Sequence, residues 1–461
     1  MNNKNQLHNT RRRMIQSMVG GSLLIPAIVQ DLMAAEAAPI DPLAPRAPHF
    51  PGKAKRVIYI YLSGGMSHVD TFNYRPKLFA DNGKEMGKSF VRRPNWEFKP
   101  YGQCGMMISD IFPHVGSVAD ELCLINSMAT FTPCHTAATL GLHTGSTTVA
   151  RPSLGAWVSY GLGTENQNLP SFVVLADKMP YHGAEVWGAE FLPACHQGTR
   201  VIPGSDEPIA NVRRRLPAEE LQAAELELIG SLNQQHLLGR ERDPQLAARI
   251  RSFETAAGMQ LEAPETYDLS KESDATLELY GLKRETKGGF AWQAIVARRM
   301  AERGVRFIEV IDKGSDTASN WDNHSEMAKH GPLAKEVDQP IAALIKDLKS
   351  RGMLNDTLVV ITTEFGRTPT VTKGDKNGRG HHSRCYSSIL VGGGTKAGIT
   401  YGTPDDYGIE VAEDRVHAHD FNATILHLLG FDHERLTYRH AGLDFRLTGV
   451  DPCHVVKGVL A

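Results

Sequence analysis

Five short segments of the sequence carry the side chains best suited to chemistry. Each contains histidine, carboxylate or guanidinium groups, and together they are 64–70, 134–136, 321–324, 364–367 and 380–382. Imidazole and carboxylate groups are the usual ligands of zinc-type and manganese-type hydrolytic centres. If the fold brings these segments together, they predict a metal-dependent hydrolytic site.

The predicted metal ligands are Asp70, Asp322, His324, Glu364 and His381. Asp322 and His324 are two positions apart, so on an extended backbone they face the same side, as two ligands of one ion would. The expected cofactor is a divalent cation such as zinc, calcium or manganese, whose identity the sequence leaves open. Taken singly, a histidine near a strand end also serves as an ordinary hydrogen-bonded structural residue.

Three residues are assigned catalytic roles. His68 or His135 is the expected general base, because imidazole changes charge near neutral pH. Arg367 is expected to hold an anionic ester group, since a planar guanidinium matches sulfate and phosphate oxygens in a bidentate manner. The alternative for Arg367 is a salt bridge with a nearby carboxylate, and the residues alone do not choose between the two.

The central element expected to position these groups is the run 357–361. It is β-branched and almost wholly apolar, which predicts a strand buried on both faces of a sheet. Glu364, Gly366 and Arg367 follow at once. Because ligands of open α/β sheets bind just beyond the carboxyl ends of the strands, we expect this strand to deliver an acid and an arginine to the site.

Similar apolar runs alternate with helical patterns along the chain. Strands are predicted at 56–62, 122–125, 172–175, 305–311 and 388–391, and helices at 135–142, 152–160, 289–303, 325–350 and 420–429. This alternation predicts a mostly parallel central sheet with helices on both faces. From about 181 to 288 the strand patterns vanish, and helical patterns at 217–238 and 243–257 predict a helical insertion.

The composition is that of an ordinary globular protein, with 461 residues, 41% hydrophobic and 22% charged. Its 50 basic and 52 acidic side chains leave a net charge of −2, which argues against nucleic acid or an anionic membrane surface as a partner. None of the six cysteines forms a C-x-x-C pair, so a structural zinc site is not expected. The pairing of the thiols stays open.

The first 37 residues resemble a twin-arginine signal peptide. Arg11, Arg12 and Arg13 precede a weakly apolar segment, and the small residues at 35–37 suit a cleavage site. A membrane anchor is the alternative, but the apolar run at 14–29 is shorter than the ~20 residues that span a bilayer. We therefore expect export by the twin-arginine machinery to the periplasm or beyond, with no stable membrane span after cleavage. A proline-rich linker is predicted at 38–55.

Longer motifs resemble those of one exported family. They are Gly-Gly-Met-Ser-His-Val-Asp-Thr-Phe (64–72), Trp-Asp-Asn-His (321–324), Thr-Glu-Phe-Gly-Arg-Thr-Pro (363–369), Gly-Arg-Gly-His-His (378–382) and the closing run 419–438. In these motifs the chain resembles domain-of-unknown-function family 1501, which is grouped with the alkaline phosphatase and sulfatase superfamily. The resemblance implies one alkaline-phosphatase-like domain at 56–461, a three-layer α/β sandwich. It also implies a two-metal site for anionic sulfate or phosphate esters, with sulfated polysaccharides among the expected partners.

At the site, this chain departs from the superfamily pattern. Ser63 stands where the superfamily places an aspartate, and Phe365 where it places a histidine ligand. His135 stands in the position of the nucleophile, ten residues before Gly145. Its neighbour Cys134 lacks the Cys-x-Pro-x-Arg context of a formylglycine precursor. These departures disagree with the standard two-metal displacement.

Two functions follow from this pattern. The first is an exported metal-dependent hydrolase of sulfate or phosphate esters, with a site rebuilt around the residues named above. The second is a non-catalytic binding or assembly protein on a degenerate form of the same fold, which the missing ligands and nucleophile favour. Fold alone does not separate them, because one architecture hosts many functions.

Overall fold

A computed structural model describes residues 41–205, 207–209, 218–240, 243–372 and 377–461. The predicted signal peptide at 1–37 lies outside the described residues. The predicted linker, described from residue 41 on, lies against the rest of the chain: Leu43 is buried, and the Phe50 backbone N–H donates to the Gly430 carbonyl at 3.1 Å. In the described ranges, no helix combines the length and apolarity needed to cross a bilayer.

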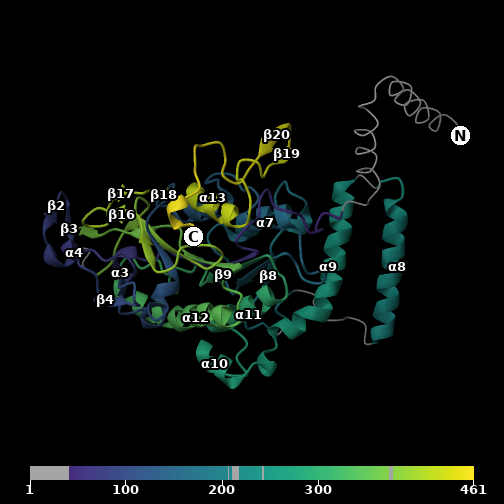
Figure 1. The fold of residues 1–461 in the computed structure, drawn as a ribbon, viewed down its shortest axis with the longest axis horizontal. Helices are drawn as coiled ribbons and strands as arrows, with labels where there is room; N and C mark the ends of the chain where they lie inside the picture. Colours follow the sequence, from purple (N-terminus) through teal and green to yellow (C-terminus); the bar gives the residue numbers. More distant parts are fainter. Residues whose placement is uncertain (1–40, 206, 210–217, 241–242, 373–376) are drawn as a thin grey trace.

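A sheet of nine described strands forms the centre of the molecule (Figure 1). In spatial order the strands are β15 (Ile399–Tyr401), β6 (Leu122–Ala129), β14 (Tyr386–Val391), β10 (Thr357–Thr362), β1 (Arg56–Leu62), β9 (Phe307–Asp312), β7 (Phe172–Ala176) and β8 (Thr199–Val201), with β18 (Val416–His417) also paired to β6. Among these strands, β14 runs antiparallel to β10 and β6, and the other pairings are parallel. The predicted mostly parallel sheet is confirmed.

The central strands are buried because their residues are apolar on both faces. β1 is buried along its whole length except at Arg56, its first residue. It pairs in parallel with β10, where Ile60 lies opposite Ile361, and with β9, where Ile60 lies opposite Val310. Both neighbours run in the same direction as β1, so the carboxyl ends of all three strands lie at one edge of the sheet.

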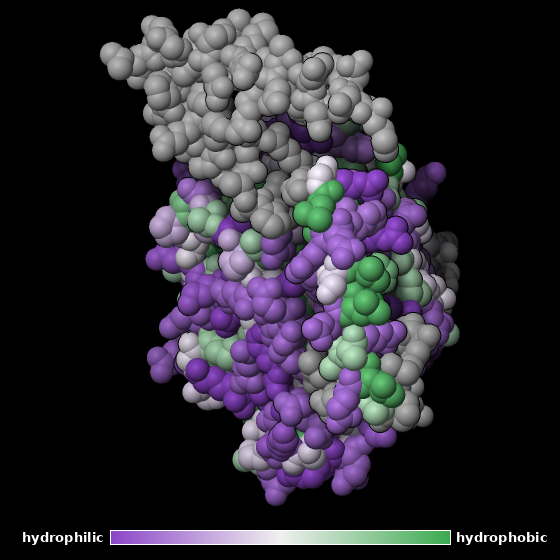
Figure 2. All heavy atoms as spheres, turned by 90° about the vertical axis from the view of Figure 1, so that its right-hand side faces the viewer, coloured by the Kyte–Doolittle hydropathy of each residue, from purple (hydrophilic) through white to green (hydrophobic). Residues whose placement is uncertain are grey.

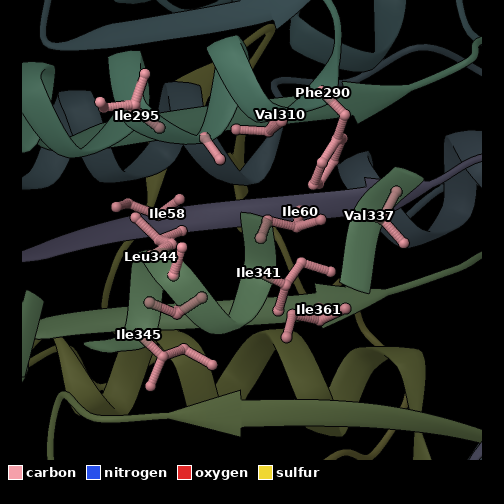
Figure 3. Packing of buried hydrophobic residues seen from close by; sticks show 14 of the residues in the cluster. Ile58, Ile60, Phe290, Ile295, Val310, Val337, Ile341, Leu344, Ile345 and Ile361 are labelled. Carbon is pink, nitrogen blue, oxygen red and sulfur yellow. The ribbon is translucent and has the colours of Figure 1, made fainter. Parts of the chain in front are cut away.

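One face of the sheet is covered by α11 (Phe290–Glu302) and α12 (His330–Ser350). Ile58 and Ile60 of β1 belong to the core on this face, together with Ile341 of α12 (Figure 3). Figure 1 shows both helices below the sheet. Removing these aliphatic side chains from water contributes roughly 25 cal/mol for each Å² of apolar surface buried, which fixes the helices to the sheet.

The opposite face is covered by α7 (Leu154–Leu162) and α13 (Ala418–Leu428), and α6 (His135–Thr144) adds Leu142 to the core on this face. Tyr59 and Tyr61 of β1 point into this second core, because alternate side chains of a strand face opposite sides. The predicted three-layer α/β sandwich with helices on both faces is confirmed.

Three α-helices lie in the range of the predicted insertion, namely α8 (Glu219–Leu237), α9 (Pro244–Tyr267) and α10 (Asp274–Tyr280). Figure 1 shows α8 and α9 at the side of the molecule, and α8 exposes Leu221, Leu228 and Leu232. Figure 2 shows apolar groups gathered on that side, among polar ones. Strand β8 lies within the same range and pairs with β7 at the edge of the sheet. With only three residues, β8 is too short to show a period, so the sequence pattern did not predict it.

Candidate metal centre

Four side chains converge beyond the carboxyl ends of the central parallel strands. His135, Asp322, His324 and His381 place their ligand atoms within 4.8 Å of one another. The three histidine Nε2 atoms all lie close to one oxygen, Asp322 Oδ1, at 3.2 Å for His135, 2.9 Å for His324 and 3.3 Å for His381. Three imidazoles and a carboxylate gathered in this way are a donor set for one metal ion.

Each ligand candidate reaches this point from the end of a regular element. His135 is the first residue of α6, after the N-cap residue Cys134. Asp322 and His324 lie in the loop that follows β9. His381 lies in β13 (His381–His382), which pairs antiparallel with the two-residue strand that follows β10. The expectation that segments beyond the strand ends meet at one edge is met by these four residues.

The other ring nitrogen of two histidines is held by the protein. His381 Nδ1 lies 2.8 Å from the Pro133 carbonyl oxygen, which can only accept, so this nitrogen carries the hydrogen. His135 Nδ1 lies 2.5 Å from Glu364 Oε1 and donates to that carboxylate in the same way. In the neutral rings the Nε2 lone pairs would then be free to bind a cation, whereas a protonated ring can donate from Nε2 to Asp322 Oδ1, which lies 3.3 Å from His381 Nε2. A second-shell carboxylate or carbonyl on the outer nitrogen is the usual arrangement of metal-binding histidines.

The three distances from Asp322 Oδ1 match those between ligands of one metal ion, while the group as a whole spans up to 4.8 Å, so the ring nitrogens must move closer together to bind one. With zinc–ligand bonds of ~2.0–2.1 Å, two ligand atoms of a tetrahedral site lie about 3.3 Å apart, and the observed separations from Asp322 Oδ1 are 2.9–3.3 Å. Among the described residues, the buried His135 Nε2 finds no hydrogen-bond partner, since its contact with Asp322 is not aligned for one. A buried polar atom without a partner is costly, and a bound cation would satisfy it.

The electrostatics of the cluster are strongly perturbed. Burial lowers the pKa of His135, but the Asp322 and Glu364 carboxylates outweigh burial and raise this pKa to about 9. Burial raises the pKa of Asp322, but the neighbouring His135 and His381 rings, with the charge of Arg367, hold it well below its ordinary value. Without an ion, His135 therefore carries an extra proton, which a bound cation would displace.

Glu364 lies behind the cluster, although the sequence predicted it as a ligand. Its buried carboxylate accepts from His135 Nδ1, from the Tyr61 hydroxyl at 2.8 Å and from the Gly64 backbone N–H at 3.0 Å. Burial raises the pKa of Glu364, but the hydrogen bond from His135 and the charge of His135 outweigh burial. The pKa of Glu364 is therefore below its ordinary value, and the carboxylate is ionised. The structure therefore places Glu364 as the group that orients His135.

Arg367 is fully buried, and its guanidinium already donates to protein oxygens. Nε donates to the Gly65 carbonyl at 2.8 Å, and Nη2 donates to the Gly64 carbonyl at 2.5 Å and to Asp322 Oδ1 at 2.6 Å. The predicted role of holding an anionic ester needs donors directed at solvent, and these are directed at the protein. Arg367 instead forms the alternative that the sequence left open, a salt bridge with a nearby carboxylate, here Asp322.

His68 and Asp70 lie outside the cluster, so the structure does not bring these two predicted site residues to it. The His68 ring is buried, with Nε2 3.1 Å from the Gly408 carbonyl oxygen. Asp70 accepts from Arg379 Nε at 2.7 Å and from Ser67 Oγ at 2.5 Å, and both charged side chains of this ion pair are fully buried. Local partners thus satisfy both residues.

Two aromatic residues at the site were not predicted. The Tyr61 hydroxyl bonds to Glu364, and the Tyr181 ring stacks on His135 with 4.4 Å between centroids. Tyr61 had a signal in the sequence, because it is a polar-tipped side chain near the end of a buried strand. Tyr181 lies in an irregular segment, where no periodicity marks it.

The chain belongs to a known family. The family model described as "Protein of unknown function (DUF1501)" matches residues 54–460. This confirms the resemblance drawn from the motifs. No curated protein shows a match to the chain.

Comparison with solved structures finds partial likenesses. The PsFucS1 sulfatase from Pseudoalteromonas sp. has 15% identity and a TM-score of 0.35, with 88% of this chain and 70% of that one covered. The Ps i-CgsB complex with k-i-k-neocarrahexaose has 10% identity and a TM-score of 0.37, with 82% and 73% covered. A TAB5 alkaline phosphatase mutant with Mg bound in its M3 site has 9% identity and a TM-score of 0.37, with 83% and 99% covered. At these identities and TM-scores, we transfer no activity or residue role from them.

Proposed function

We propose that this protein is a metal-dependent hydrolase of sulfate or phosphate esters. The observation that carries the proposal is the convergence of three imidazoles on the Asp322 carboxylate, two of them held by second-shell acceptors. The predicted two-metal site is replaced in this proposal by one ion on His135, Asp322, His324 and His381. A donor set of three nitrogens and one oxygen favours zinc over calcium, which prefers oxygen ligands.

Bound there, a divalent cation would supply Lewis acidity toward an ester oxygen and toward water. The protein residues prepare the place for it. Glu364 holds His135 by its outer nitrogen, and Arg367 holds Asp322 while balancing its charge. His324 is the most exposed candidate ligand, with 49% of its side chain accessible against 8% for Asp322, so we assign the open side for an ester to His324.

Direct attack by water follows from what stands at position 135. The side chain there is an imidazole whose Nδ1 faces Glu364 and whose Nε2 faces the cluster, so neither ring nitrogen is free to attack an ester. The proposed reaction therefore cleaves the ester in one displacement.

We further propose export to the periplasm or cell exterior, which rests on the twin-arginine pattern at 1–37, and anionic or sulfated polysaccharide esters as substrates.

Metal analysis of protein purified without chelator tests the centre. We expect about one zinc ion per chain, lost in His381→Ala and kept in His440→Ala, a control at an exposed histidine of β19 (Tyr438–His440). Protein that binds no stoichiometric metal, or equal metal in both variants, would contradict the proposal.

A screen of aryl sulfates and aryl phosphates then tests catalysis. Turnover that disappears in His381→Ala is expected. The second candidate function is metal-dependent binding without turnover, and the imidazole in place of a nucleophile at position 135 favours it. Stoichiometric metal together with no hydrolysis of either ester class would select that second function.

A further inference from the structure

A surface hollow lies close to the candidate metal centre. It has a volume of about 510 Å³ and is lined by Asn82, the segment 92–96 and Ala328. Arg93, Asn82 and Asn95 are exposed, whereas Trp96 is half-buried. None of these residues takes part in the metal cluster.

The loop that carries two candidate ligands also reaches the hollow. Ala328 follows His324 by four residues, so their Cα atoms are at most roughly 14 Å apart. The His324 backbone also touches Gly378, where an added Cβ would lie 1.2 Å from the His324 carbonyl oxygen, and the Gly378 carbonyl accepts from Arg92 Nη1 at 2.9 Å. The loop that carries His324 and the Gly378 backbone therefore connect the exposed side of the centre to the hollow.

The lining combines a cation, an indole and two amides. Arg93 pairs with Glu97 on the surface, a kind of ion pair worth little in water, so its guanidinium can exchange that partner for a ligand anion. Guanidinium suits a planar pair of sulfate oxygens. The Trp96 ring is held against α12, since its Cζ2 lies 3.4 Å from where a Gly331 Cβ would stand.

The two amides complete the lining. The Asn82 side-chain oxygen accepts from the Arg93 backbone N–H at 3.0 Å, and the Asn95 side-chain oxygen accepts from Arg92 Nη2 at 2.8 Å. With their oxygens engaged, the amides offer NH₂ donors. An indole suits the apolar face of a pyranose ring, amide donors suit its hydroxyls, and a guanidinium suits a sulfate on the ring.

We propose that this hollow binds a sulfated sugar unit, next to the unit whose ester meets the metal centre. The substrate class is then a sulfated oligosaccharide or polysaccharide. Its relation to the reaction rests on the proposed function, but binding to the hollow does not. A polyphosphate chain would engage the guanidinium and the amide donors but leave the Trp96 ring unused.

Binding of a sulfated galactan hexasaccharide to the mature protein, followed by calorimetry, tests the proposal. We expect Arg93→Ala and Trp96→Ala each to weaken binding on the order of tenfold, as loss of a charge-assisted hydrogen bond or a ring contact does. Arg384→Ala is the matched control, because Arg384 is likewise exposed and paired with a surface glutamate, Glu410. Unfolding temperatures of the three variants identify any loss of folding.

The desulfated hexasaccharide and inorganic polyphosphate form the other arms. We expect the desulfated hexasaccharide and the polyphosphate each to bind more weakly than the sulfated hexasaccharide. Equal affinity for sulfated and desulfated sugar, tighter binding of polyphosphate, or unchanged affinity in both hollow variants would overturn the subsite. Binding is measured without turnover, so a protein that binds the sulfated sugar but hydrolyses no ester would refute the proposed function and keep this inference.

Discussion

Two neighbouring clusters of acids and cations lie at the same edge of the sheet, and they differ in how their charges are satisfied. Around Asp70, a carboxylate is matched by Arg379 and by the Ser67 hydroxyl. Around Asp322, the buried Arg367 likewise supplies a counter-charge, but three imidazole nitrogens also lie near the same oxygen, and a buried Nε2 is left without a hydrogen bond among the described residues. The first cluster is complete as protein, whereas the second is the one that we propose binds a cation. The types of residue are alike, and only the arrangement separates a structural ion pair from a ligand site.

The largest effect is expected on the free energy of unfolding, when the buried ion pair of the first cluster is broken. Asp70→Asn leaves the Arg379 guanidinium buried without its counter-charge, which should destabilise the fold by about 3–5 kcal/mol while metal content stays unchanged. Urea unfolding and metal analysis measure the two quantities. Asp444→Asn, in the exposed pair with Arg439, is the control and should cost little. Metal loss in Asp70→Asn at unchanged stability would make Asp70 a ligand after all.

The same pair predicts a pH dependence. Burial raises the pKa of Asp70, but the Arg379 charge and the Ser67 hydrogen bond take it below its ordinary value in the folded protein. The pKa of Asp70 is lower in the folded protein than in the unfolded chain. The ion pair therefore contributes its full stability well above pH ~4, and this stabilisation is lost as pH falls through the folded-state pKa. Asp70→Asn should therefore be less sensitive to acid than the wild type over this range.

In the second cluster, Asp322→Asn should weaken metal binding by more than about 100-fold, since changes behind the ligands alone cost 10–100-fold. Competition with a fluorescent zinc chelator measures the affinity. Asp316→Asn is a matched control in the same loop, where Asp316 is exposed and paired with Lys178. Equal affinities in the two variants would show that Asp322 is no ligand.

Glu364→Gln should weaken metal binding by about 10–100-fold, because His135 loses the charge that orients it and raises its basicity. Glu309→Gln provides the control. Glu309 forms the same kind of buried pair with His143 Nε2, at 2.8 Å, but outside the cluster, so the metal affinity should not change. A similar loss in both variants would mean that buried charge in general, and not the orientation of His135, sets the affinity.

The smallest effect is expected at Tyr61. Tyr61→Phe removes one hydrogen bond to Glu364, which should cost about 1 kcal/mol of stability and a few-fold in metal affinity. Tyr59→Phe is the control on the same strand, because the Tyr59 hydroxyl has no hydrogen-bond partner among the described residues. A larger effect at Tyr59 than at Tyr61 would reject the network behind His135.

The local sequence predicted the regular elements closely. β1 was predicted at 56–62 and lies there, because seven residues with an apolar majority suit only a covered strand. The helix predicted at 152–160 begins later, at Leu154, since the Ser153 hydroxyl accepts from the Ala156 backbone N–H and caps it. The reversed direction of β14 was not predicted, because strand direction is not encoded in the period of apolar residues.

The site itself was predicted in part. Asp322, His324 and His381 were predicted as ligands, and the structure brings all three to one point. His135 was predicted as a base and lies among the candidate ligands, while Glu364 lies behind it. The free cysteines and the exposed α8 face carry no part of this site.

The sequence by itself determined the long central strands, most of the helices and the side chains that follow those strands, because the period of apolar residues is a local property, whereas short strands such as β8 have no period to read. Only the tertiary structure decided which imidazoles meet. His68 and His135 stand in similar local settings, at the start of a helix beyond a strand, yet one bonds to Gly408 and the other faces Asp322. The physical reason is that convergence depends on how segments far apart in the chain pack against one another, and no single segment contains that information.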